Sequence, residues 1–108
     1  MKREITFVNL TSHELNETTT GIRLKPSGVV VRVHQTTEKV AEYSGMPIYK
    51  AKFGEVLGLP EPKEGIIYVV SAMALSAISE SRKDVVAPGF LKRDANGVVV
   101  GSVGFRTR

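Results

Sequence analysis

Only one segment of this sequence has the composition of a helix, which limits the chain to a fold built mainly from strands. Residues Ser71 to Ile78 read Ser-Ala-Met-Ala-Leu-Ser-Ala-Ile, and alanine, leucine and methionine favour helix. Elsewhere the apolar residues form runs of strand length, separated by glycine, proline and polar residues typical of turns. We therefore expect an α+β fold with a mostly antiparallel sheet of about six to eight short strands and one main helix.

The apolar runs give the predicted strands. They are Ile5–Leu10, Ile22–Leu24, Val29–Gln35, Thr37–Tyr43, Ile48–Phe53, Ile66–Val70 and Val85–Ala87, followed by a hairpin from Phe90 to Phe105. Polar residues 11–21 predict a loop, and the two glycines of 54–60 predict an irregular buried strand end.

Turn residues predict how these strands are joined and where they end. Pro26-Ser27-Gly28 predicts a hairpin between the strands on either side of it. Pro88-Gly89 predicts the end of one strand. Asn96-Gly97 predicts a type I′ turn, because this dipeptide tolerates two positive φ angles. The helix has apolar residues around most of its circumference, so we expect it to be largely buried.

The length of 108 residues predicts a single domain spanning 1–108. A chain of this size buries only about 60–70% of its unfolded surface, so its small core favours self-association. No apolar run approaches the roughly 18 residues of a membrane span. The N-terminus has no signal-type stretch, so we expect an intracellular protein without a membrane partner.

Cysteine is absent and the net charge is +4. The missing thiols exclude disulfides, thiolate metal sites and cysteine nucleophiles. The carboxylates show no metal-ligand spacing, and no catalytic motif is present, so we expect neither metal, cofactor nor enzymatic activity. The basic residues concentrate within 82–108, which leaves a nucleic-acid-binding protein as an alternative, although few aromatic residues are available for base stacking. A hydrolase or transferase using His13 as base is a third hypothesis.

The first candidate binding residue is Ser71, at the junction of a buried strand and the helix. Free backbone N–H groups at a helix start bind anions, and small neighbouring residues allow a phosphate to approach. The alternative is a simple capped core helix.

A second candidate group follows the first strand and contains Asn9, Thr11 and His13. Loops at strand ends often hold binding residues, because a rigid scaffold positions them. His13 can donate or accept hydrogen bonds. The alternative is a plain turn in which Asn9 satisfies backbone groups.

A third candidate group is charged and contains Arg82, Asp84 and Arg93. Arginine forks suit phosphate, so we expect Arg93→Ala to weaken binding of an anionic ligand. The alternative is a solvated surface in which each arginine has a neighbouring aspartate. Arg32 is a further candidate, because an arginine among valines needs a partner or a water-filled face.

The order of several segments resembles a known family. These segments are Asn9–His13, Pro26–Gly28, Phe53–Pro62, Tyr68–Ala72, Asp84–Gly89 and Arg93–Gly97. The pattern is similar to a family of small phage and prophage proteins, and within it to the Thoeris anti-defence proteins of the first type. Ser12 stands where the family commonly has proline.

The resemblance implies a sponge that binds cyclic ADP-ribose isomers or cyclic oligonucleotides, which bacterial immune systems use as signals, and sequesters them without cleavage. It also implies the cytoplasm of an infected bacterium and a homo-oligomer, either a dimer or a hexamer, with ligand pockets between subunits. Carried onto this sequence, it makes Ser71, the polar strand end and the arginines candidate ligand contacts, whereas a nucleic-acid polymer is not expected as a partner.

Overall fold

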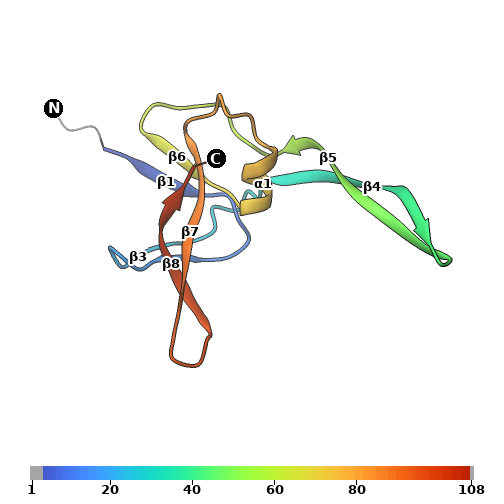
Figure 1. The fold of residues 1–108 in the computed structure, drawn as a ribbon. Helices are drawn as coiled ribbons and strands as arrows, with labels where there is room; N and C mark the ends of the chain where they lie inside the picture. The colour runs from blue at the N-terminus through green and yellow to red at the C-terminus, as the bar shows by residue number, and fades with distance from the viewer. Residues whose placement is uncertain (1–3, 108) are drawn as a thin grey trace.

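The strands of the computed structural model, which describes residues 4–107, form one six-stranded sheet and one separate two-stranded ribbon (Figure 1). The chain order is β1 (Thr6–Asn9), β2 (Leu15–Glu17), β3 (Ile22–Leu24), β4 (Arg32–Tyr43), β5 (Met46–Leu57), β6 (Ile66–Val69), α1 (Ala72–Ala77), β7 (Val85–Arg93) and β8 (Val99–Arg106). This is an α+β fold, and most of its paired residues are antiparallel.

The order of strands in the larger sheet is β1-β6-β7-β8-β2-β3. Three of its ladders, β1–β6, β6–β7 and β2–β8, are parallel and short. The two ends of the sheet approach each other, because Asn9 of β1 forms an isolated bridge with Pro26 just after β3. The sheet is therefore curled towards a half-closed barrel.

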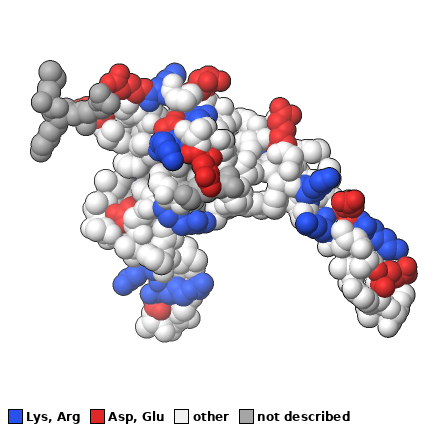
Figure 2. Space-filling view, turned by 45° about the horizontal axis from the view of Figure 1, so that its top comes forward, with Lys and Arg blue, Asp and Glu red and all other residues white. Residues whose placement is uncertain are grey.

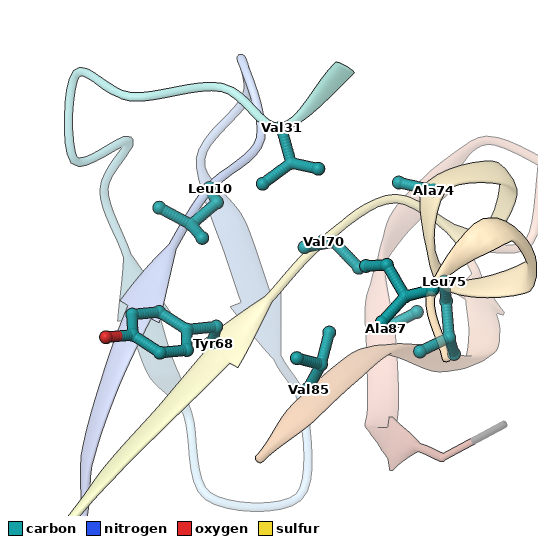
Figure 3. Packing of buried hydrophobic residues seen from close by; sticks show 9 residues of the cluster. Leu10, Val31, Tyr68, Val70, Ala74, Leu75, Val85 and Ala87 are labelled. Atoms are coloured by element: carbon teal, nitrogen blue, oxygen red, sulfur yellow. The ribbon is translucent and has the colours of Figure 1, made fainter. Parts of the chain in front are cut away.

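The hydrophobic core lies between one face of this sheet and α1 (Figure 3). Tyr68 of β6 pairs with Val85 of β7, so the two side chains share this face. Leu75 of the helix and Val31 from the segment before β4 cover it. The core is small, as the length predicted, and the Tyr68 hydroxyl leaves it to donate a hydrogen bond to the Glu61 carbonyl at 3.1 Å.

The helix is shorter and less buried than its composition predicted. It spans six residues, Ser71 caps it, and its buried residues are Ala74 and Leu75, with Ile78 buried at the C-cap. Met73 is exposed. The prediction of a largely buried helix is wrong because only one face meets the sheet. No helix within residues 4–107 has the length and apolarity needed to cross a membrane.

The largest difference from the sequence prediction is the ribbon of β4 and β5, which we call the arm. Val29–Gln35, Thr37–Tyr43 and Ile48–Phe53 were expected as separate strands, but the chain forms two twelve-residue strands instead. Residues 54–57, expected in a buried strand end, belong to β5 and are mostly exposed. Only the base of the arm reaches the core, through Val33 and Val56.

Of the two long hairpins, one turns where Ser44-Gly45 was expected to close the strand Thr37–Tyr43, and the turn of the other differs from expectation. The arm turns at Ser44-Gly45, where both φ angles are positive, 50° and 79°, as a type I′ turn requires. At the predicted type I′ turn only Gly97 has a positive φ. The Gly97 N–H donates to the Asp94 carbonyl at 3.0 Å and the Asp94 N–H donates to Val98 at 2.9 Å, so this hairpin has a three-residue loop.

Strand pairing overturns three further predictions. Within the predicted loop 11–21 lies β2, which pairs with β3 and β8. The expected hairpin across Pro26–Gly28 is therefore absent from the described chain, because β3 pairs with β2, the strand that precedes it, and not with the strand that follows it. The predicted stop at Pro88-Gly89 is also wrong, because β7 continues through it to Arg93.

Candidate functional site

One cavity brings together three of the eight predicted binding residues, and it lies where the loop after β1, the start of α1 and strands β7 and β8 meet. We call it the Arg106 pocket. Its volume is about 400 Å³, and its lining residues are Thr11, His13, Leu15, Ser71, Ala72, Pro88, Gly89, Leu91 and Arg106. A volume of this size lies within the range of small-ligand sites, roughly 300–1,000 Å³.

The walls of the Arg106 pocket are apolar and its rim is polar. Leu15, Pro88 and Leu91 supply the walls, whereas His13 and Arg106 are exposed at the rim. The Arg106 guanidinium makes no hydrogen bond or ion pair with the described residues. Because the charged lining residue is cationic, the pocket suits a ligand with a flat apolar part and a negatively charged edge.

Asn9 lies beneath this pocket and holds its loop in place. The side chain is buried. Its Nδ2 donates to the carbonyls of His13 at 2.7 Å and Leu24 at 2.9 Å. Its Oδ1 accepts from the Thr11 N–H at 2.9 Å and the Thr11 hydroxyl at 2.7 Å. These four hydrogen bonds use the amide almost fully, so Asn9 positions Thr11 and His13 rather than facing the cavity.

Ser71 caps the helix that borders the Arg106 pocket. Its Oγ accepts a hydrogen bond from the Ala74 N–H at 3.1 Å, which is the geometry of an N-cap. Ser71 also lines a neighbouring cavity of about 230 Å³ on the other side of the helix start, together with Arg32 and Met73. The structure thus places Arg32 next to the pocket, at the base of the arm, but not in its lining.

Arg82 and Asp84 lie apart from the Arg106 pocket and bind each other. Arg82 Nε donates to Asp84 Oδ1 at 2.9 Å and Nη2 donates to Oδ2 at 3.0 Å, and Nη2 also donates to the Pro60 carbonyl at 2.9 Å. The hydrogen bond from Arg82 holds the pKa of the Asp84 carboxyl below its usual range, while partial burial opposes this shift. Arg82 borders a third cavity of about 200 Å³ with Lys83 and Thr107.

Arg93 is also separate, near the tip of the β7–β8 hairpin. Its Nη1 donates to the Gly97 carbonyl at 2.8 Å, which ties the side chain to the turn. Of the eight predicted site residues, Thr11, His13 and Ser71 therefore meet in the Arg106 pocket, with Asn9 behind them and Arg32 beside them. Arg82, Asp84 and Arg93 do not join them.

Sequence reasoning missed Arg106 and Leu91 as site residues. Arg106 was noted only as part of the basic C-terminal region, and no motif distinguishes it. It reaches the pocket because β8 pairs with β7, with Arg106 opposite Ala87. In the sequence, only the predicted hairpin from Phe90 to Phe105 indicated that these two strands pair. No other sequence feature placed Arg106 near the pocket.

The described residues include no group of three or more His, Asp or Glu side chains placed to hold a metal ion. No protein-family model, curated protein or solved structure matches this chain.

Proposed function

We propose that this protein is a phage anti-defence sponge, which binds a cyclic ADP-ribose isomer or a cyclic oligonucleotide and sequesters it without cleavage. The observation that supports this most is the Arg106 pocket, which combines apolar walls with a guanidinium that makes no hydrogen bond or ion pair with residues 4–107. A cyclic nucleotide presents the same two features, because a base is flat and a phosphate or pyrophosphate is anionic. The family resemblance supports the same ligand class.

Binding to the pocket can be tested by calorimetric titration with cyclic ADP-ribose isomers and cyclic di- and trinucleotides, followed by heat release and chromatography of the ligand. We expect binding of at least one of them and recovery of the unchanged ligand. A cleaved product would contradict the sponge and support the hydrolase hypothesis with His13 as base.

Two arginine variants separate the pocket from the other cationic sites. Arg106→Gln should raise the dissociation constant of the ligand by about tenfold or more, because one charge-assisted hydrogen bond is lost. Arg93→Ala is the matched control, because Arg93 lies on the same hairpin but is tied to the Gly97 carbonyl. The sequence alone predicted that Arg93→Ala weakens binding, whereas the pocket geometry predicts unchanged binding. If Arg93→Ala weakened ligand binding and Arg106→Gln did not, the binding site would lie outside the Arg106 pocket.

A basic nucleic-acid-binding phage protein is the second candidate function, which the net charge of +4 favours. In Figure 2, however, the Lys and Arg side chains lie in separate groups on the arm, the hairpin and the central part, with carboxylates among them. Binding to a polyphosphate backbone weakens steeply with salt. Tight DNA or RNA binding with that salt dependence, and no binding of cyclic nucleotides, would favour this second function.

A further inference from the structure

The far half of the arm exposes a group of large apolar side chains on one face. Ala41 pairs with Ile48, and Tyr43 pairs with Met46, so these four share a face. Val40 lies at the irregularity beside Ala41. The exposed fractions are 67% for Tyr43, 65% for Met46 and 42% for Ile48. We call the four paired residues Ala41, Tyr43, Met46 and Ile48 the distal face of the arm.

The arm has little to stabilise it within its own chain. Twelve-residue strands are about 40 Å long, and two-stranded ribbons are marginally stable alone in water. The arm projects away from the rest of the molecule (Figure 1). The radius of gyration is accordingly 16.9 Å, compared with about 13 Å for a compact chain of this length. Beyond its base, where Val33 and Val56 reach the core, a packing partner for the arm would come from another molecule.

A second uncovered apolar surface lies on the large sheet, on the face opposite the core. Phe7 of β1 and Phe105 of β8 stack there, with ring centroids 5.3 Å apart. Phe90 pairs with Val103, which lies two residues before Phe105 on the same face of β8. Phe90 is 85% exposed. A cavity of about 190 Å³ between Phe7, Ile22, Leu24 and Phe105 adjoins it. We call this surface the Phe90 face.

We propose that the distal face of the arm docks onto the Phe90 face of a second copy of this chain, and that two copies exchange arms around a two-fold axis. The arm cannot cover the Phe90 face of its own chain, because the arm and the β7–β8 hairpin extend in different directions (Figure 1). This contact names the surfaces that would meet in the homo-oligomer that the family resemblance implies, and in that respect it rests on the proposed function.

The area that such an exchange buries fits a stable dimer. One face of the arm, about 40 Å by 10 Å, covers roughly 400 Å². Each contact buries this area on both chains, and reciprocal exchange makes two such contacts. The total buried area is therefore roughly 1,600 Å², which is the standard size for a specific interface. A single contact between two arms buries roughly half of that, which is the size of a crystal contact. The geometry therefore favours arm onto sheet over arm onto arm.

The charges of the arm permit this contact. The arm carries four cationic and three anionic side chains. Glu38 pairs with Lys50, and both lie on the same side of the arm as the distal face. Lys39 and Glu42 form an ion pair at 3.3 Å. Because the arm is nearly neutral, it can approach the basic β7–β8 hairpin without strong repulsion. The apolar tip forms the centre of the contact and the charged half its polar rim.

The absence of cysteine makes a direct cross-linking test possible. Chains carrying Ile48→Cys are mixed with chains carrying Phe90→Cys and mildly oxidised without any ligand. We expect a disulfide-linked dimer containing one chain of each kind to dominate. Tyr49→Cys mixed with Phe90→Cys is the matched control, because Tyr49 is adjacent but points to the opposite face of the arm.

Three results would overturn the proposal. They are Ile48→Cys chains that link only to one another, equal linking by the Tyr49→Cys control, and no intermolecular disulfide at all. Because no ligand is present, these results are independent of cyclic-nucleotide binding. A failed ligand titration would leave the arm contact standing, and a failed cross-link would leave the Arg106 pocket standing.

Sedimentation equilibrium gives a second measurement on cysteine-free chains. Ile48→Lys should weaken self-association by about tenfold or more, because a charge enters the apolar centre of the contact. Tyr49→Lys should leave the association constant within about twofold of the unmodified chain, because Tyr49 lies on the face of the arm that points away from the contact. A monomeric unmodified chain, or equal effects of the two variants, would contradict the proposal.

Discussion

Glu17 is the residue whose importance is least visible in the sequence. Its carboxylate is buried and accepts hydrogen bonds from the N–H groups of Gly104 at 2.7 Å, Thr19 at 3.0 Å and Thr20 at 2.8 Å, and from the Thr20 hydroxyl at 2.9 Å. These bonds join the turn after β2 to β8. They lower the pKa of Glu17 from its ordinary value of 4.5 to about 2, led by the bond from Gly104.

Stability should therefore depend on pH through Glu17. A lowered pKa in the folded state means that the stabilisation is complete above pH 4.5 and is lost as pH falls from 4.5 to about 2. We expect the urea midpoint of the unmodified chain to fall across this interval. Glu17→Gln should lower the midpoint at neutral pH and flatten its pH dependence, because an amide nitrogen cannot accept the bonds from Gly104 and Thr19.

Glu14→Gln is the control for this experiment, because Glu14 lies on the same segment but is exposed. It should behave like the unmodified chain. An unchanged pH profile in Glu17→Gln would show that Glu17 does not anchor β8.

The candidate site was partly predictable at the scale of residues. Thr11 and His13 were selected because polar residues that follow strand ends often bind ligands, and Ser71 because free N–H groups at a helix start bind anions. All three line one pocket. The rule that arginine suits phosphate selected Arg82 as well, and the alternative kept open for it was an arginine beside a neighbouring aspartate. Asp84 occupies the guanidinium with two hydrogen bonds. Sequence patterns identify chemistry, whereas only the fold determines which groups are already paired.

At the scale of elements, β7 shows how a turn signal is overridden. Pro88-Gly89 predicted a stop, yet both residues lie in the middle of β7. Gly89 is required there by close approach rather than by a turn. A Cβ atom at this position would lie 2.4 Å from the Val103 carbonyl oxygen and 3.0 Å from that of Gly104. The dipeptide thus serves the β7–β8 pairing instead of ending it.

Gly89→Ala should therefore destabilise the fold by about 1–3 kcal/mol, as overpacking generally does. Gly54→Ala in the arm is the matched control, because its Cβ would lie 3.5 Å from the nearest atom, the His34 carbonyl oxygen, in ordinary contact. We expect Gly54→Ala to be neutral or to stabilise by up to about 1 kcal/mol. Chemical denaturation measures both, and equal midpoints for the two variants would contradict the close approach at Gly89.

The arm was predicted as pieces for a related reason. Its strands mix apolar and polar residues on both faces, so no single alternation marks their full length. Short runs such as Ile48–Phe53 were recognised, but their continuation through Gly54 to Leu57 was not. The turn at Ser44-Gly45 was recognised as a strand end, and the structure places the tip of the arm there.

At the scale of the whole molecule, the class of fold was predictable and the strand order was not. Local composition indicates which residues form strands, but it carries no information on which strand lies beside which. The order β1-β6-β7-β8-β2-β3 joins segments from opposite halves of the chain. The Arg106 pocket depends on this order, because β8 brings Arg106 next to the loop after β1.

The shape of the molecule predicts uneven stability. In hydrogen exchange at concentrations where the chain is monomeric, amides of the far half of the arm should exchange faster than those of β6 and β7, because that half has no core behind it. Raising the protein concentration should slow exchange in the arm selectively, as it docks onto a second copy. Equally slow exchange in both regions at low concentration would mean that the arm is stable alone.

The hydrogen bond between Glu17 and Gly104 has a consequence for how the protein is made. The two residues are 87 positions apart, which a ribosome takes roughly 4 to 17 s to translate at about 5–20 residues per second. Until β8 leaves the ribosome, β2 and β3 pair only with each other, and the edge of β2 that joins β8 in the finished sheet stays unpaired. The first strands to be synthesised therefore wait for the last, and during that interval the nascent chain is a substrate for chaperones and proteases.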